Sequence, residues 1–126
     1  MMTPEIQQWL DALRSGKYKQ GRDCLRSTDD EFCCLGVACD LLAPNAWELR
    51  DYTYMESEWR HLDGNVHHLP LDLVNRFGFS VHFCYALEFR NDEGKTFAEI
   101  ADYIEKHIAS GLAFTASSTY GFEDDE

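Results

Sequence analysis

Two adjacent cysteines at the start of an apolar segment are the best candidates for a catalytic nucleophile. Cys33 and Cys34 lie in the first turn of a helix predicted over residues 32–42, where the helix dipole lowers the pKa of a thiol. His67 could accept the thiol proton and Asn91 could orient that histidine, as in a cysteine hydrolase. Adjacent cysteines in a buried helix are more simply core residues, so we expect no enzymatic activity and keep a hydrolase using Cys33 or Cys34 as the alternative. Other residues of suitable type for this mechanism are His68, His82, Asp92 and Gln20.

A basic segment in an otherwise acidic chain could bind a small anion such as a nucleotide. Residues 14–26 carry five of the eleven Lys and Arg residues against one acid, Asp23. The two glycines of this segment would let backbone N–H groups approach a phosphate, and its tyrosine could stack on a base. The glycine spacing matches no known phosphate loop, so a solvated loop whose cations offset nearby acids is the alternative. The candidate ligand-binding residues are Lys17, Tyr18, Lys19, Gln20, Arg22 and Arg26.

The acidic surface is the other candidate for binding. The net charge of −12, from 23 acids against 11 Lys and Arg residues, opposes unaided binding to nucleic acid or to an anionic membrane and favours a basic protein partner. A solvated acidic surface is the commoner explanation of such charge. No Cys-x-x-Cys or His-Glu-x-x-His motif occurs, and we expect neither a metal nor a cofactor. The acids that could face a partner protein are Glu56, Glu58, Asp63, Asp92 and Glu93.

The apolar segment 32–42 is predicted to be the central buried helix of the fold, because its apolar residues fall on every side of a helical wheel. Residues 27–30 offer candidate N-caps for it. Gly36 in its middle indicates that another backbone or a ligand comes close. Asp40 must either pair with a cation, for which Arg22 or Arg26 is available, or occupy a solvated edge of the helix.

The remaining elements give an α+β fold, mainly helical with a small central β-hairpin. A first helix begins at Thr3 and ends near residues 15–16, and a last helix begins at Thr96 with a capping box. A short helix follows residues 69–70 and ends at Gly78. A hairpin is predicted within residues 47–68, with its turn at 63–65, and residues 91–94 read as a turn. Residues 81–89 fit a strand or a helix equally well.

One compact domain is expected over residues 1–114, followed by a flexible acidic tail over residues 115–126. The five cysteines are expected to be reduced and mostly buried, which fits a cytoplasmic protein. The sequence contains no apolar stretch of 18 residues that would span a membrane and no recognisable secretion signal.

Several motifs in order resemble a group of small accessory proteins of tailed phages and prophages. The motifs are residues 13–21 (LRSGKYKQG) with Trp9 before them, residues 33–37 (CCLGV), residues 69–70 (LP), and residues 91–92 (ND) with 97–102 (FAEIAD). The resemblance implies a protein that acts in the cytoplasm of a bacterial host, and small accessory proteins of that kind often block host machinery or anti-phage defence. We therefore expect a binding protein that inhibits a host or defence component, either through its acidic surface or by sequestering a small anion.

Overall fold

A computed structural model describes residues 2–27, 29–52, 57–62 and 67–114 of the chain, and in β4 and β5 the side chains of residues 49–52 and 57–62 lie outside the description. Five α-helices and a five-stranded sheet form one α+β domain, as predicted. The helices are α1 (Pro4–Ser15), α2 (Cys34–Leu42), α3 (Leu71–Phe77), α4 (Val81–Asp92) and α5 (Phe97–Ser110), with 3-10 turns η1 (Pro44–Ala46) and η3 (Leu112–Phe114). The strands are β1 (Lys19–Gln20), β2 (Arg26–Ser27), β3 (Glu31–Phe32), β4 (Trp47–Tyr52) and β5 (Ser57–Leu62).

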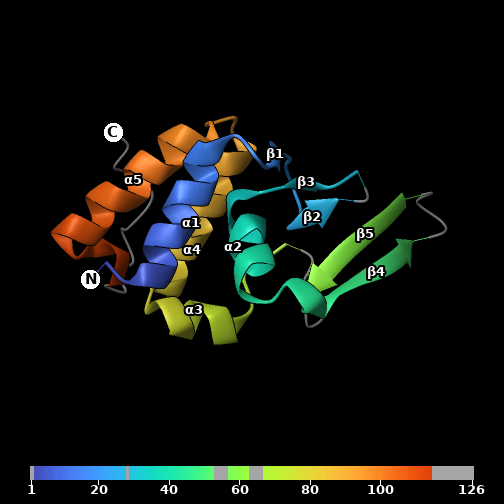
Figure 1. Cartoon of the computed structure of the whole chain (residues 1–126), viewed down its shortest axis with the longest axis horizontal. Coiled ribbons are helices and arrows are strands. Elements are labelled where there is room, and N and C mark those ends of the chain that lie inside the picture. Colours follow the sequence, from blue (N-terminus) through green and yellow to red (C-terminus); the bar gives the residue numbers. More distant parts are fainter. Residues whose placement is uncertain (1, 28, 53–56, 63–66, 115–126) are drawn as a thin grey trace.

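Local signals set the ends of α1, α3 and α5 as predicted. Thr3 caps α1, and Thr96 and Glu99 form the capping box of α5. Gly78 ends α3 with a positive φ of 80°, a conformation that glycine adopts without steric cost. α1 and α5 each bury one apolar stripe, and the two helices pack together (Figure 1).

The strand order is β1-β3-β2-β5-β4, in which β1 and β3 are parallel and the other pairs are antiparallel. Figure 1 shows the helices gathered at one end of the molecule and the sheet at the other, with α2 between them. The predicted hairpin is confirmed as β4 and β5, but its strands connect through residues 53–56 and not through residues 63–65. The turn predicted at residues 63–65 lies outside the described residues.

The centre of the fold is α2, which begins two residues later than predicted. Phe32 belongs to β3, where it pairs with Arg26 of β2, and the N-cap is Cys33, whose Sγ accepts a hydrogen bond from Gly36 N. The prediction that residues 27–30 cap this helix is therefore wrong, because the strand β3 separates them from its start. Residues 34–39 are all buried, as predicted.

Gly36 allows the backbone of residue 25 to lie against α2. A Cβ built on Gly36 would overlap the carbonyl oxygen of Leu25 and would lie 2.7 Å from its carbonyl carbon. The same carbonyl oxygen accepts a hydrogen bond from Cys33 N, at 3.3 Å. The predicted close approach at this glycine is confirmed, and its partner is backbone.

α4 resolves the ambiguous segment as a helix. It runs over Val81–Asp92, so Asn91 and Asp92 belong to its last turn, and of the turn predicted over residues 91–94 only residues 93–94 form one. Its apolar residues lie on both the buried and the exposed side, which explains why the periodicity did not separate helix from strand. The five cysteines are buried and free of disulfides, as expected. In the described part of the chain, no helix has the length and apolar character needed to cross a membrane.

Candidate functional site

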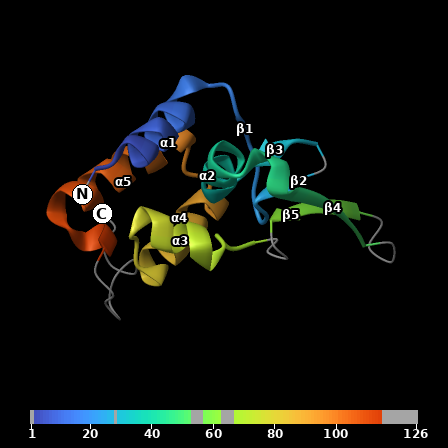
Figure 2. The same cartoon turned by 60° about the horizontal axis from the view of Figure 1, so that its bottom comes forward.

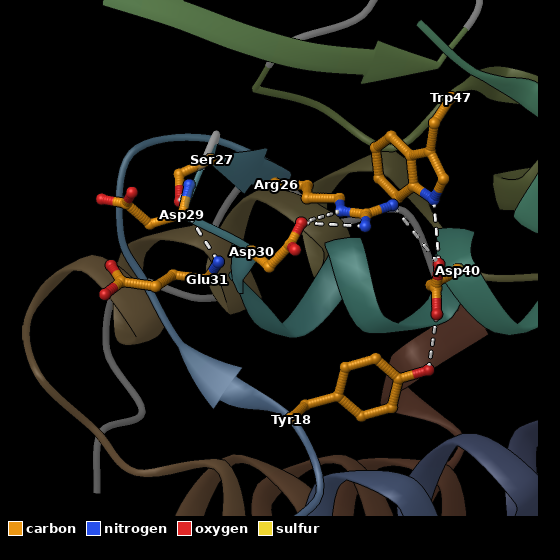
Figure 3. A network of polar contacts seen from close by, with 8 residues as sticks. All are labelled: Tyr18, Arg26, Ser27, Asp29, Asp30, Glu31, Asp40 and Trp47. Carbon is orange, nitrogen blue, oxygen red and sulfur yellow. Dashed lines mark hydrogen bonds and ion pairs between the residues drawn. The ribbon is translucent and has the colours of Figure 1, made fainter. Parts of the chain in front are cut away.

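The basic segment is largely bound into the fold by its own side chains. Tyr18 Oη donates a hydrogen bond to Asp40 Oδ2 at 2.8 Å, and Trp47 Nε1 donates one to Asp40 Oδ1 at 3.0 Å (Figure 3). Arg26 lies 2.8 Å from Asp30 and 3.8 Å from Asp40, which confirms Arg26 as the predicted partner of Asp40. Asp40 is thus held by three donors, and Tyr18 and Arg26 are taken up in structural contacts.

Two more of the six candidate ligand-binding residues have partners within the protein, although Lys19 is exposed. Gln20 Nε2 donates hydrogen bonds to Asn91 Oδ1 at 2.9 Å and to Lys95 O at 2.8 Å. Lys19 Nζ pairs with Glu31 at 3.2 Å. Lys17 and Arg22 are exposed. The structure therefore uses four of these six side chains to join β1, β2, α2 and α4, and the residues expected to read a base have intramolecular partners.

The cysteine nucleophile lacks the low pKa on which its prediction depended. Burial raises the pKa of Cys33 to about 12 and the pKa of Cys34 well above its ordinary value. The prediction that the helix dipole lowers these pKa values is wrong, because loss of hydration at a buried site outweighs the dipole. The Cys34 thiol lies 3.7 Å from the carbonyl oxygen of Leu87.

The other two residues of the hydrolase alternative serve different roles in the structure. His67 is exposed and its Nδ1 contacts the carbonyl oxygen of Asp23. Asn91 is fully buried: its Oδ1 accepts a hydrogen bond from Cys34 N at 3.2 Å and its Nδ2 donates one to Gly21 O at 2.8 Å. Asn91 therefore fixes α4 against the start of α2. The hydrolase alternative instead needed Asn91 to orient His67.

The exposed side of α4 carries an unusual row of large apolar side chains. Val81, Tyr85 and Phe89 follow one another at steps of four residues and are 40%, 50% and 58% exposed. Leu71 of α3 is 65% exposed. Figure 2 shows α3 beside α4 at the side of the molecule opposite α1. Apolar residues gathered on one exposed side in this way are typical of a binding surface.

A groove follows α4 beside this apolar row. Its first cavity, of about 480 Å³, lies between α3 and α4, and its second, of about 520 Å³, lies between α4 and the segments around residues 23 and 67. His68 and Glu88 line both cavities, so the two adjoin. The first cavity is mainly apolar and is lined by Leu69, Pro70, Leu71, Asp72, Val74, Val81, Cys84 and Tyr85 besides the shared pair. The second carries more acids and is lined by Asp23, Cys24, Cys33, His67 and Asp92 besides the shared pair.

The groove is negatively charged. Asp23, Asp72, Glu88 and Asp92 line it, and among the described residues that line the two cavities there is neither Lys nor Arg. His68 Nδ1 lies 2.9 Å and 3.0 Å from the two carboxylate oxygens of Glu88. Burial raises the pKa of Glu88, and the hydrogen bond from His68 opposes that shift in part. A partly desolvated carboxylate that faces an open groove is suited to receive a cation.

The structure places only part of the predicted acidic surface at this groove. Asp92 lines the second cavity, and Glu93 is exposed directly after α4. Glu56 and Asp63 lie outside the described residues, as does the side chain of Glu58. Sequence reasoning missed Asp72 and Glu88 as residues that line the groove. The helical spacing of Val81, Tyr85 and Glu88 was the signal that could have indicated this face, once the segment was assigned as a helix.

Comparisons with known proteins identify one matching family model and no individual relative. A family model described as a domain of unknown function, DUF8296, matches residues 2–108. No curated protein and no solved structure matches the chain.

Proposed function

The chain belongs to the DUF8296 family, whose description assigns no activity, and we propose that it is a protein-binding accessory factor that inhibits its partner by occupying a basic surface of it. The groove along α4 carries the proposal, since it joins exposed apolar side chains to four carboxylates without a Lys or Arg in its lining. Interfaces between proteins combine an apolar centre with a charged rim in this way.

The phage resemblance of the sequence motifs supplies the biological setting of the proposal. A small accessory protein of this type would act in the bacterial cytoplasm, and its partner would be a host or defence protein that handles nucleic acid or another anion. Such partners carry basic grooves, which acidic side chains can fill. The binding energy would come from the apolar row, while the acids would speed encounter and select for a basic partner.

The test compares what the protein retains from a lysate of infected bacteria with what matched variants retain. Leu71→Glu adds a charge to the apolar half of the groove, and Leu112→Glu makes the same change at a 44% exposed leucine of η3. We expect one partner to be retained by the wild type and by Leu112→Glu and to be lost from Leu71→Glu. Retention should also fall as salt rises from about 0.05 M to about 0.5 M, because exposed charges are then screened. A partner retained equally by all three proteins would contradict the groove, and the absence of any partner from the wild type would contradict the proposed function.

A further inference from the structure

The two halves of the groove differ in chemistry, and their order along α4 specifies the kind of ligand that can fill both. Val81 and Tyr85 line the apolar half. Glu88 and Asp92 line the acidic half, together with Asp23. These four residues of α4 share one face of the helix, since their spacings of three and four residues correspond to about one turn each.

We propose that the groove binds a basic peptide segment of a partner protein, which inserts one apolar side chain between α3 and α4 and places a Lys or Arg against Glu88 and Asp92. This inference rests on the proposed function and names the partner chemistry of the same site.

The apolar half explains the first element of the peptide. Leu71 and Tyr85 expose 65% and 50% of their surface at the mouth of a cavity of about 480 Å³, which exceeds the volume of a single Leu or Phe side chain. Covering these groups with an apolar side chain removes apolar surface from water on both partners, which is favourable by about 25 cal/mol per Å². Leu69 and Pro70, which are both buried, also line this half.

The acidic half explains the second element. Glu88 is partly buried and has one described partner, His68, whose side chain is 57% exposed and whose contact is 2.9 Å long. Asp92 Oδ1 accepts a hydrogen bond from Asp23 N at 3.0 Å, which leaves further acceptor capacity on its carboxylate. A guanidinium or ammonium group placed between Glu88 and Asp92 would meet two carboxylates one turn apart, and a guanidinium could bind either of them with two parallel hydrogen bonds.

The spacing of the two halves predicts the spacing within the peptide. The midpoint of Val81 and Tyr85 and the midpoint of Glu88 and Asp92 are seven residues apart along α4, which corresponds to about 10 Å. A helical ligand would bridge this distance with side chains seven residues apart, and an extended ligand would do so with side chains about three residues apart.

Other occupants fit the groove less well. A nucleic acid or a free phosphate would meet four carboxylates and no Lys or Arg in the lining. Within the described residues, no three His, Cys, Asp or Glu side chains are arranged to hold a metal ion. A second copy of the chain would bring the same net charge of −12, and of its basic segment Lys19 and Arg26 already pair with carboxylates. Charge complementarity therefore favours a basic partner of different sequence.

The experiment selects ligands from a random library of displayed peptides on the wild-type protein and removes those that also bind Leu71→Glu. We expect the enriched peptides to share an apolar residue and a Lys or Arg at one of the two predicted spacings. Binding of a synthetic enriched peptide should weaken at least about tenfold with Glu88→Gln and should be unchanged with Leu112→Glu, as measured by fluorescence anisotropy. A peptide in which the selected cation is changed to Glu should bind Glu88→Lys more tightly than it binds the wild type, because the charges of the pair are exchanged.

The outcomes separate this inference from the proposed function. Enriched peptides that lose binding with Leu71→Glu but lack a cation, or that bind Glu88→Gln as well as the wild type, would overturn the partner chemistry and leave a protein-binding groove. If no peptide remains enriched over an unrelated acidic protein after the peptides that bind Leu71→Glu are removed, both would be overturned. Thermal unfolding of each variant shows whether a loss of peptide binding comes from a change in the groove or from unfolding of the protein. Glu88→Gln serves as the conservative second variant beside Leu71→Glu.

Discussion

Carboxylates and aromatic side chains occur together at two places: at the junction of Asp40 with the basic segment and in the groove along α4. At the junction they have partners within the protein, and in the groove they are largely open to solvent. At the junction, Asp40 has Tyr18, Trp47 and Arg26 as partners, and the guanidinium of Arg26 lies 5.0 Å from the ring centre of Phe32 and 5.3 Å from that of Trp47. In the groove, a carboxylate meets one imidazole and the neighbouring aromatic side chain is half exposed.

The difference shows that charge contrast in a sequence does not identify a binding surface. The junction satisfies its polar groups internally and so stabilises the fold, whereas the groove leaves a partly desolvated carboxylate and apolar side chains open to a partner. If this comparison is right, substitutions at the junction should change stability and substitutions in the groove should change binding. Four predictions test that division, beginning with the largest effect.

Gly36→Ala should destabilise the protein by about 3 kcal/mol or more, or prevent folding, because the new Cβ would overlap the backbone of Leu25. Urea unfolding followed by circular dichroism measures the loss. Gly16→Ala is the matched control: Gly16 has a φ of 79° and no atom within 4 Å of a built Cβ, so that substitution should cost only about 1 kcal/mol of backbone strain. Equal losses in the two variants would contradict the close packing of α2.

Alkaline pH should destabilise the fold because the groove-lining thiols belong to the core. Burial raises the pKa of Cys24, Cys33 and Cys84 to about 12. The unfolded chain releases these protons near pH 8.5 while the folded chain keeps them, so the free energy of unfolding should fall by about 1 kcal/mol per thiol between about pH 8.5 and about pH 9.5.

Urea unfolding under reducing conditions at several pH values measures this decline, and Cys84→Ala should reduce it by about 1 kcal/mol, the share of one thiol. Rapid alkylation of the native protein at neutral pH would contradict the prediction and would revive the hydrolase alternative that uses Cys33 or Cys34.

Asp40→Ala should cost about 2 kcal/mol, because it leaves the Trp47 indole and the Tyr18 hydroxyl without the carboxylate to which both donate. Asp30→Ala removes the other carboxylate beside Arg26 at an exposed position and should cost less than about 1 kcal/mol. Thermal unfolding compares the two variants, and a smaller loss for Asp40→Ala than for Asp30→Ala would break the contrast between junction and groove.

Glu88→Gln should leave the stability at neutral pH unchanged or slightly increased while it weakens binding. Burial raises the pKa of Glu88, so the folded state favours the protonated form and its ionisation at neutral pH is unfavourable. The wild type should therefore gain stability relative to Glu88→Gln as the pH falls through that raised pKa. A strong loss of melting temperature in Glu88→Gln at neutral pH would assign Glu88 a structural role instead.

Sequence reasoning succeeded where the signals are local. The caps and apolar stripes of α1 and α5 depend on residues within one or two turns. Gly36 predicted a close contact because little else explains a glycine in a buried helix. It failed where distant segments decide the structure. Phe32 joined a strand because of its pairing with Arg26, and Lys19 and Arg26 of the basic segment pair with the acids Glu31 and Asp40.

The groove could not be derived from the sequence for the same reason. α4 has apolar residues on both faces, and only the tertiary structure shows that one of those faces lacks a covering helix. The acids of the groove come from three separate segments, so that no charge run in the sequence marks them.

The walls of the groove come from residue 23, from residues 67–74 and from α4, which the chain brings together only when it folds. An array of overlapping linear peptides from this sequence would therefore not reproduce the surface. A truncated chain that lacks residue 23 or α4 would lose one of its walls. The surface is a discontinuous epitope. An antibody against it would bind the folded protein and not the unfolded chain.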